Sequence, residues 1–285
     1  MHPHFVELQR LLTERPLVMG ILNVTPDSFS DGGRWIQSDA AVAHALDMAA
    51  AGADLIDVGG ESTRPGAPGV GMEEEMARVL PVLSALGKAL PGLPLSIDTQ
   101  KAELARRAVE AGACLVNDVS ALTHDPAMGA TVAALGSGVC LMHRLEAPAG
   151  AAWSPVEGSR YGEEGVSAAV ISFLKGRLEA CARAGIAREA VWLDPGLGFG
   201  KSVADNLRLL KDLPLLAGLG LPVLVGPSRK SFVGAVLGGL SVEERLEGTL
   251  AACAVALWQG ASVLRVHDVK ETVRVLRMVT ATKSA

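Results

Sequence analysis

Aromatic residues are scarce in this sequence, and positive charge is not in excess. Phe, Trp and Tyr make up 4% of the 285 residues, which argues against the aromatic platforms that stack on single-stranded nucleic acid. The formal net charge is −5, so bulk electrostatics do not favour nucleic-acid binding either. A local basic pocket for a small anion is compatible with this balance. The sequence therefore predicts small-molecule partners and no nucleic acid.

Cysteine and long apolar runs are also lacking. The four cysteines, Cys114, Cys140, Cys181 and Cys253, form no Cys-x-x-Cys pair, and such isolated thiols in apolar settings are typical of a reduced, cytoplasmic protein. No apolar run is long enough to span a membrane, and no basic segment precedes an apolar one at the start. We expect no membrane association, and we expect residues 1–4 to be a frayed terminus rather than a metal site.

What the sequence does have is a regular alternation of strand-like and helix-like segments. The expected strands are 17–22, 54–58, 95–98, 114–118, 139–143, 191–194, 222–226 and 262–267. The expected helices are 39–51, 72–90, 101–111, 126–135, 163–184, 203–210, 242–258 and 269–282. We expect Ser38 or Asp39 to cap the first helix and Pro81 to kink or split the second.

Eight such units over this length favour one closed (β/α)8 TIM barrel, residues 1–285, with its active site at the C-terminal mouth of the strands. The strands are apolar throughout, as parallel strands covered by helices are. A doubly wound open sheet is the alternative. No composition shift or long linker marks a second domain.

Polar residues follow the expected strands at the ends that meet at this mouth. They are Asn23, Glu61 to Arg64, Asp98, Asn117, His143, Asp194, Ser228 to Lys230, Arg265 and His267. Helix capping and loop solvation explain a second set equally well, namely Asp118, Asp125, Asp205 and Asp268. Carboxylates and an amide at strand ends suit a heterocycle that presents two adjacent N–H donors.

Positive side chains at the same mouth suit a phosphorylated group. Arg64, Lys230, Arg265 and His267 can supply this charge, and Asn23 offers an oxygen of the kind Mg²⁺ prefers. The loop 23–33 after the first strand carries hydroxyls, carboxylates, an amide and Phe29. The mouth therefore predicts an aromatic-heterocycle pocket beside an anion pocket.

Two glycine-containing stretches fail the motifs that they first suggest. The run 194–202 does not fit Gly-x4-Gly-Lys-Ser, because the first glycine would fall on Pro195, and it does not fit Gly-x-Gly-x-x-Gly. Its small residues instead suit a close approach of the backbone to a flat ring. The stretch 226–230 likewise fails the Gly-x-Ser-x-Gly nucleophile elbow.

Seven stretches in order along the chain resemble the dihydropteroate synthase family. They are Gly20 to Gly33, Gly59 to Gly66, Ser96 to Thr99, Val116 to Asp118, Asp194 to Lys201, Ser228 to Ser231 and Arg265 to Asp268. The resemblance implies a (β/α)8 fold, Mg²⁺ and a homodimer. It implies condensation of 6-hydroxymethyl-7,8-dihydropterin diphosphate with p-aminobenzoate, giving 7,8-dihydropteroate and pyrophosphate, and it implies inhibition by sulfonamides.

The resemblance also implies roles for individual residues. The pterin would be held by Asp98, Asn117, Met142, Asp194, Gly198, Phe199 and Lys230. The diphosphate would be held by Asn23, Thr63, Arg64, Arg265 and His267, with Asn23 also at the metal. The p-aminobenzoate site would be bordered by Phe29, Thr63, Arg64, Pro65 and Ser228. The residues expected to take part in catalysis are Asp98, Lys230, Arg265 and His267.

Two departures from the family pattern concern loops. Residues 142–148 depart from the usual Met-His-Met-Gln-Gly-x-Pro, and Pro227 removes a backbone donor before Ser228.

The chemistry that the resemblance implies is a dissociative substitution at the pterin methylene, with a cation that Asp98 could stabilise. Three alternatives stay open from sequence: a corrinoid methyltransferase type of barrel, a non-catalytic pterin-binding paralogue, and a Schiff-base aldolase using Lys230.

Overall fold

Eight parallel strands form the core of the described part of the chain. The structure is a computed structural model, and it describes residues 1–25, 34–62, 69–145 and 158–285. The strands lie in the order β6-β5-β4-β3-β2-β1-β8-β7. A single bridge between Leu193 and Val223 joins the two ends of this order, so the sheet is a nearly closed barrel. This confirms the expected (β/α)8 class.

The strand bounds follow the expected segments closely. They are β1 Leu17–Asn23, β2 Leu55–Gly59, β3 Leu95–Asp98, β4 Ala113–Asp118, β5 Gly138–Met142, β6 Val191–Asp194, β7 Leu224–Val225 and β8 Val263–Val266. Strand β7 has two residues, where five were expected. The strands are almost entirely buried, because barrel-interior side chains line one face and helices cover the other.

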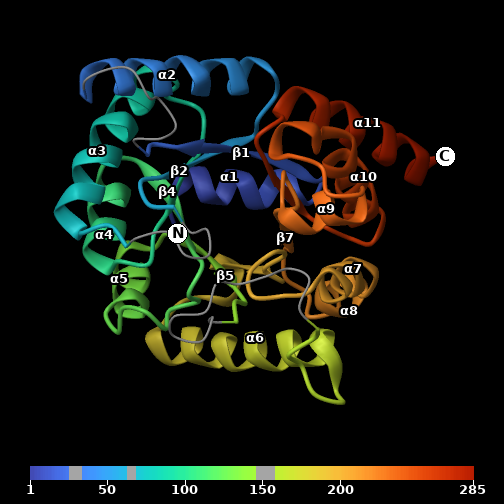
Figure 1. Ribbon diagram of the computed structural model, residues 1–285. Helices are drawn as coiled ribbons and strands as arrows, with labels where there is room; N and C mark the ends of the chain where they lie inside the picture. Colours follow the sequence, from blue (N-terminus) through green and yellow to red (C-terminus); the bar gives the residue numbers. More distant parts are fainter. Residues whose placement is uncertain (26–33, 63–68, 146–157) are drawn as a thin grey trace.

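Helices surround the barrel (Figure 1). Those of the βα units are α2 Arg34–Ala50, α3 Met72–Ala89, α4 Ala102–Glu110, α5 Met128–Leu135, α6 Gly165–Ala184, α7 Val203–Lys211, α10 Leu246–Trp258 and α11 Val269–Ser284. The expectation for α2 was wrong, because the helix begins at Arg34, so Ser38 and Asp39 lie inside it. Pro81 does not split α3, which continues through it to Ala89.

Four further elements were not expected. Helix α8, Leu213–Ala217, follows α7, helix α9, Ser231–Val236, follows β7, and short 3₁₀ turns occupy Arg188–Ala190 (η2) and Val242–Glu244 (η3). The fifth departure is α1, Pro3–Leu12, which replaces the expected frayed terminus at least from Pro3 onward.

Helix α1 is anchored to the amino ends of β4 to β6. His2 N donates to Gly136 O at 2.8 Å, and the Phe5 ring lies 5.5 Å from the Trp192 ring. A Cβ on Gly138, at the start of β5, would lie 2.1 Å from the Phe5 ring. The helix therefore packs on the end of the barrel opposite the mouth.

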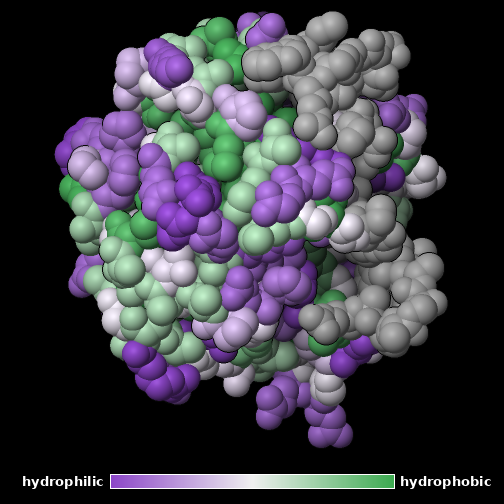
Figure 2. Space-filling view, turned by 90° about the vertical axis from the view of Figure 1, so that its left-hand side faces the viewer, coloured by the Kyte–Doolittle hydropathy of each residue, from purple (hydrophilic) through white to green (hydrophobic). Residues whose placement is uncertain are grey.

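The outer face of the barrel over α2 to α5 is mixed in polarity (Figure 2). Its hydrophilic clusters include ion pairs within α4, where Arg106 contacts both Glu103 and Glu110. Among the described residues, no helix is both long and apolar enough to cross a membrane.

Strand register sets the level of the polar residues at the mouth. Asn23 is paired in register with Gly59, Gly59 with Asp98, and Asp98 with Asn117. Across the barrel, Met142 is in register with Asp194. The polar strand ends therefore form rings at two neighbouring levels around one opening.

Candidate active site

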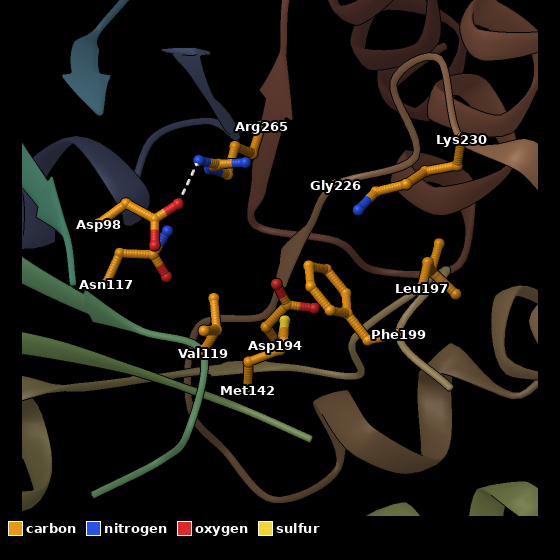
Figure 3. Close-up of a pocket in the computed structure, with 10 residues that line it drawn as sticks. All are labelled: Asp98, Asn117, Val119, Met142, Asp194, Leu197, Phe199, Gly226, Lys230 and Arg265. Atoms are coloured by element: carbon orange, nitrogen blue, oxygen red, sulfur yellow. Dashed lines mark hydrogen bonds and ion pairs between the residues drawn. The ribbon is translucent and has the colours of Figure 1, made fainter. Parts of the chain in front are cut away.

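A narrow hollow lies at the carboxyl ends of the strands. It is lined by Asp98, Asn117, Val119, Met142, Asp194, Leu197, Phe199, Gly226, Lys230 and Arg265 (Figure 3). Asp98 and Asn117 form one wall, and Asp194, Phe199 and Lys230 face them across the space. The hollow thus combines apolar surfaces with carboxylates on two sides.

One wall is built around a shared guanidinium. Arg265 donates from Nε to Asp57 Oδ2 at 2.7 Å and from Nη2 to Asp98 Oδ2 at 2.8 Å. Both carboxylates are buried, at 0% and 7% exposure. Their other oxygens, the Oδ1 atoms, have no hydrogen-bond partner among the described residues. Of the two carboxylates only Asp98 lines the hollow, so its Oδ1 is the buried acceptor left for a donor from a ligand.

Burial opposes full ionisation of this wall. It raises the pKa of Asp98 to about 7, against the opposing charge of Arg265 and with the help of Asp57. Burial also lowers the pKa of Arg265, but Asp57 and Asp98 more than offset this and hold it above its ordinary value. The guanidinium stays charged, and Asp98 is the carboxyl that resists ionisation.

Asn117 extends the set of acceptors. Its Nδ2 donates to Asp57 Oδ2 at 2.9 Å, which directs the amide oxygen away from Asp57. The assignment of amide oxygen and nitrogen rests on this hydrogen bond. Asn117 therefore presents an acceptor beside Asp98, as Figure 3 shows.

The opposite wall is centred on Asp194. Its Oδ1 accepts a hydrogen bond from Gly196 N at 2.6 Å. Burial raises its pKa to about 6, while that hydrogen bond and the charge of Lys230 act in the other direction. Lys230 Nζ lies 4.0 Å from the centroid of the Phe199 ring. A flat ring placed here would meet Phe199 on its face and Asp194 on its edge.

Ser228 and His267 form a second polar pair. Ser228 Oγ lies 3.0 Å from His267 Nδ1 and accepts from His267 N at 3.2 Å. Burial, followed by the charges of Arg265 and Arg229, lowers the pKa of His267 to about 3. Burial thus favours the neutral ring in the ligand-free protein, and the expectation that His267 supplies positive charge to a diphosphate stays a prediction. In the neutral ring, Nδ1 accepts from the Ser228 hydroxyl when Nε2 carries the proton.

Pro227 and Arg229 shape the turn that carries Ser228. Lys230 N donates to Pro227 O at 3.3 Å. Arg229 has a φ of 57°, a costly conformation for a non-glycine residue. Its guanidinium donates from Nη2 to Asp268 Oδ1 at 2.6 Å and from Nε to Asp268 Oδ2 at 3.1 Å. This assigns Asp268 a structural role.

The structure brings most of the expected site residues together and leaves four outside its description. Phe29, Thr63, Arg64 and Pro65 lie outside the described residues. Asn23 and Asp98 both flank Gly59: a Cβ there would lie 3.8 Å from Asn23 Oδ1 and 3.8 Å from Asp98 Oδ2. Gly198 is packed against Lys230, since its Cβ would lie 2.9 Å from Lys230 Cδ.

The other strand-end residues divide as follows. His143 does not line the hollow, because its ring packs on Phe173 and Tyr161. Asp118 binds Ser120 and Leu122, and Asp205 forms the capping box of α7 with Ser202. Asp125 accepts from Ala102 N at the start of α4. The capping interpretation is confirmed for Asp205 and Asp125.

Sequence reasoning missed Asp57 and Lys201. Asp57 lies within β2, two residues before its end, and only its charge inside an apolar strand could have identified it. Lys201 is 1% exposed, and its burial could not be inferred from a glycine-rich loop.

Comparison with known proteins supports the interpretation of this site. The family model described as pterin binding enzyme matches residues 19–267. Dihydropteroate synthase from Escherichia coli K12 is 46% identical over 281 residues, which cover 99% of this chain and 96% of that protein. The chain belongs to the dihydropteroate synthase family.

Solved structures of dihydropteroate synthases agree with the assignment. The Xanthomonas albilineans enzyme with 4-aminobenzoic acid is 48% identical with a TM-score of 0.86, covering 95% of this chain and 94% of that one. The Yersinia pestis enzyme in a sulfonamide drug complex is 45% identical with a TM-score of 0.85, covering 95% of each chain. The matched range 19–267 includes every residue that lines the hollow.

Proposed function

We propose that the hollow of Figure 3 binds the dihydropterin ring of a diphosphate substrate. As a member of its family the chain is a transferase of folate biosynthesis, which condenses 6-hydroxymethyl-7,8-dihydropterin diphosphate with p-aminobenzoate. One observation carries the assignment of the ring: the buried carboxylates of Asp98 and Asp194 face the hollow from two sides. Pterin presents N–H donors along its edges, and its faces suit Met142 and Phe199.

Asn117, Gly198 and Lys230 complete the proposed pterin site. Asn117 supplies an acceptor, and Gly198 allows Lys230 to approach the Phe199 ring. Lys230 then acts as a hydrogen-bond donor and positive charge toward the ring. Its role is binding rather than covalent chemistry.

The diphosphate is placed at the Arg265 and His267 side of the mouth. Arg265 Nη1 makes no hydrogen bond to a described residue, because the fork uses Nε and Nη2 for Asp57 and Asp98. His267 Nε2 offers an N–H donor in the tautomer whose Nδ1 accepts from Ser228 Oγ. Asn23, Thr63 and Arg64 complete this set on the basis of the family resemblance.

The residues present fit a Mg²⁺ ion that is completed by substrate oxygens. Asn23 offers an amide oxygen at the level of Asp98, and no group of three His, Cys, Asp or Glu side chains suited to a metal occurs among the described residues. Such a donor set suits Mg²⁺, which keeps water and phosphate ligands. When bound, Mg²⁺ neutralises part of the diphosphate charge.

We place p-aminobenzoate beside the methylene group of the pterin. Ser228 borders this place next to His267, with Phe29, Thr63, Arg64 and Pro65 assigned from the resemblance. Sulfonamides resemble p-aminobenzoate and are expected to occupy the same position.

The reaction is a dissociative substitution in this proposal. The bond between the methylene carbon and the diphosphate oxygen breaks, and its electron pair leaves with the diphosphate. The dihydropterin ring delocalises the cation, and Asp98 in its ionised form stabilises it with negative charge. The amine nitrogen of p-aminobenzoate then bonds to the methylene carbon and loses one proton to solvent. Positioning of this weak nucleophile is the main requirement.

Pyrophosphate release that depends on p-aminobenzoate tests the activity. Wild-type protein with pterin diphosphate and Mg²⁺ should release pyrophosphate only when p-aminobenzoate is added, and Asp98→Asn should slow it strongly. Release without p-aminobenzoate would indicate a hydrolase instead. Scrambling of an ¹⁸O label from the bridging position, measured without p-aminobenzoate, is expected for the dissociative route.

We further propose one catalytic domain over residues 1–285, a cytoplasmic location and a homodimer. The four cysteines are buried and free, as suits a reducing compartment. Exposed apolar side chains lie on, or directly after, the contacting helices α9 and α10, namely Val236, Leu237, Val255 and Trp258. Such a patch on the surface is typical of a protein interface.

A further inference from the structure

Lys201 is among the most deeply buried side chains of the protein. It is 1% exposed and does not line the hollow. Its Nζ donates to the carbonyl oxygens of His143 at 3.1 Å, Gly196 at 2.8 Å and Phe199 at 3.1 Å. An ammonium group has three donors, and all three are used on backbone carbonyls.

These carbonyls belong to two chain segments that are packed too closely for side chains. Gly196 has a φ of 71°, and a Cβ there would lie 1.8 Å from His143 O. Gly200 has a φ of 69°, and a Cβ there would lie 2.3 Å from Leu145 O. The segments after β5 and β6 therefore bring carbonyl groups together at one point.

The hydrogen bonds of Lys201 also involve the backbone around two residues that line the hollow, Asp194 and Phe199. The Phe199 carbonyl is held by Lys201, and the Phe199 ring lines the hollow. The Gly196 carbonyl is also held by Lys201, while Gly196 N donates to Asp194 Oδ1. Removing the ammonium would leave three buried carbonyls without this donor. The Phe199 backbone, and the Gly196 backbone that binds Asp194, would then be held less firmly.

We propose that Lys201 is a positioning residue of the pterin site, whose ammonium fixes Phe199 and Asp194 in place without touching the ring. This inference rests on the proposed pterin site. Burial lowers the pKa of Lys201 to about 7; the carboxylates of Asp194 and Asp205 favour the charged form, and the charge of Lys230 opposes it. The geometry carries the inference, because three carbonyl oxygens surround Nζ and only the ammonium form offers three donors.

The variant Lys201→Met tests this by keeping the apolar stem and removing the donors. Titration calorimetry with 6-hydroxymethylpterin should show a loss of affinity of roughly 10- to 100-fold, as for other loosened supports of a binding site. The KM for pterin diphosphate should rise, while the KM for p-aminobenzoate at saturating pterin diphosphate should stay unchanged. Lys201→Gln keeps two donors on a shorter chain and should give an intermediate loss, which decides the matter if the Met variant does not fold.

Ser202→Ala is the matched control. Ser202 is adjacent, and its Oγ accepts from Asp205 N at 3.1 Å to cap α7. Its loss should lower the unfolding midpoint through the helix and leave pterin affinity within about twofold, because no carbonyl of the pterin wall depends on it.

Hydrogen exchange provides a readout that needs no pterin. In the ligand-free protein, Lys201→Met should speed exchange at 143–145 and 195–200, whereas Ser202→Ala should speed it only at the start of α7. Unchanged pterin affinity in a folded Lys201→Met, or an equal loss in Ser202→Ala, would overturn the inference. If wild-type protein does not bind the pterin, the proposed function fails instead, and the exchange measurement still tests the anchoring by Lys201.

Discussion

The ionised carboxylate of Asp194 lowers the stability of the empty protein and strengthens ligand binding. Burial raises its pKa from 3.8 to about 6, so the folded state keeps its proton longer than the unfolded state does. The free energy of unfolding therefore falls as the pH rises from about 4 to about 6. Above that range the ionised carboxylate destabilises the empty site but is the stronger acceptor for a ligand.

Asp194→Asn should separate these two effects. At pH 8 the variant should have a higher unfolding midpoint than wild type without ligand, yet bind a pterin more weakly by about 2–4 kcal/mol, because a charged acceptor facing two donors is lost. Calorimetry across pH should show a fall in wild-type affinity below pH 6 that the variant lacks, while the dependence near pH 7 that comes from Asp98 remains in both. A loss below about 0.5 kcal/mol at pH 8 would reject the role of Asp194.

Lys230 should bind without forming a covalent adduct. Its ammonium is placed over the Phe199 ring at 4.0 Å, where it is held by charge rather than freed as a neutral amine. Borohydride treatment with substrate should add no mass to the protein in mass spectrometry. An adduct mapped to Lys230 would favour the aldolase alternative, and Lys230→Arg is the control that retains charge but cannot form a Schiff base.

Single residues at strand ends could be predicted from the sequence, and their partners could not. Asp98, Asn117 and Asp194 directly follow apolar runs, so the barrel brings them to one opening. The ion pairs of Arg265 with Asp57 and Asp98 join strands far apart in sequence. Such contacts depend on side-chain direction, which composition and periodicity do not specify.

Among the elements, helix α1 was not expected, although its local sequence carries the pattern of a helix. Pro3 at its start, with Phe5 and Leu8 buried, is the pattern of an amphipathic helix. Strand β7 is a different case: its ends depend on pairing with β8, over Leu224 and Val225. Strand existence was therefore predictable from sequence, whereas the extent of this strand was not.

Gly138→Ala should loosen the packing of α1 on the barrel. The new methyl group would overlap the Phe5 ring, which lies 2.1 Å from the Cβ position, and overpacking of this kind costs about 1–3 kcal/mol. Chemical denaturation should show the loss, with little change in pterin affinity because the mouth is at the other end. Gly176→Ala in α6 is the control: its Cβ meets nothing within 4 Å, so it should stabilise by about 0.5–1 kcal/mol. Equal effects of the two variants would contradict the packing argument.

At the scale of the whole molecule, the two ends of the barrel differ in structure, and one of its sides exposes large apolar side chains. The mouth carries the buried charges, and α1 covers part of the opposite end. On the side that includes α9 and α10, Trp258 is 56% exposed and Val255 is 45% exposed, one helical turn apart. Exposed Trp and Val side chains so close together favour burial against another protein surface.

Trp258→Lys should therefore convert the proposed homodimer into a monomer. Lysine removes the large apolar surface and places one positive charge on each side of a twofold interface, where like charges repel. Sedimentation velocity at micromolar concentration should show wild type at twice the mass of the variant. Leu46→Lys on α2 is the matched control, because Leu46 is 40% exposed and lies on a different helix of the barrel. It adds the same charge and should remain a dimer. A wild type that sediments as a monomer would contradict the homodimer, whereas a dimer unaffected by Trp258→Lys would place the interface on another surface.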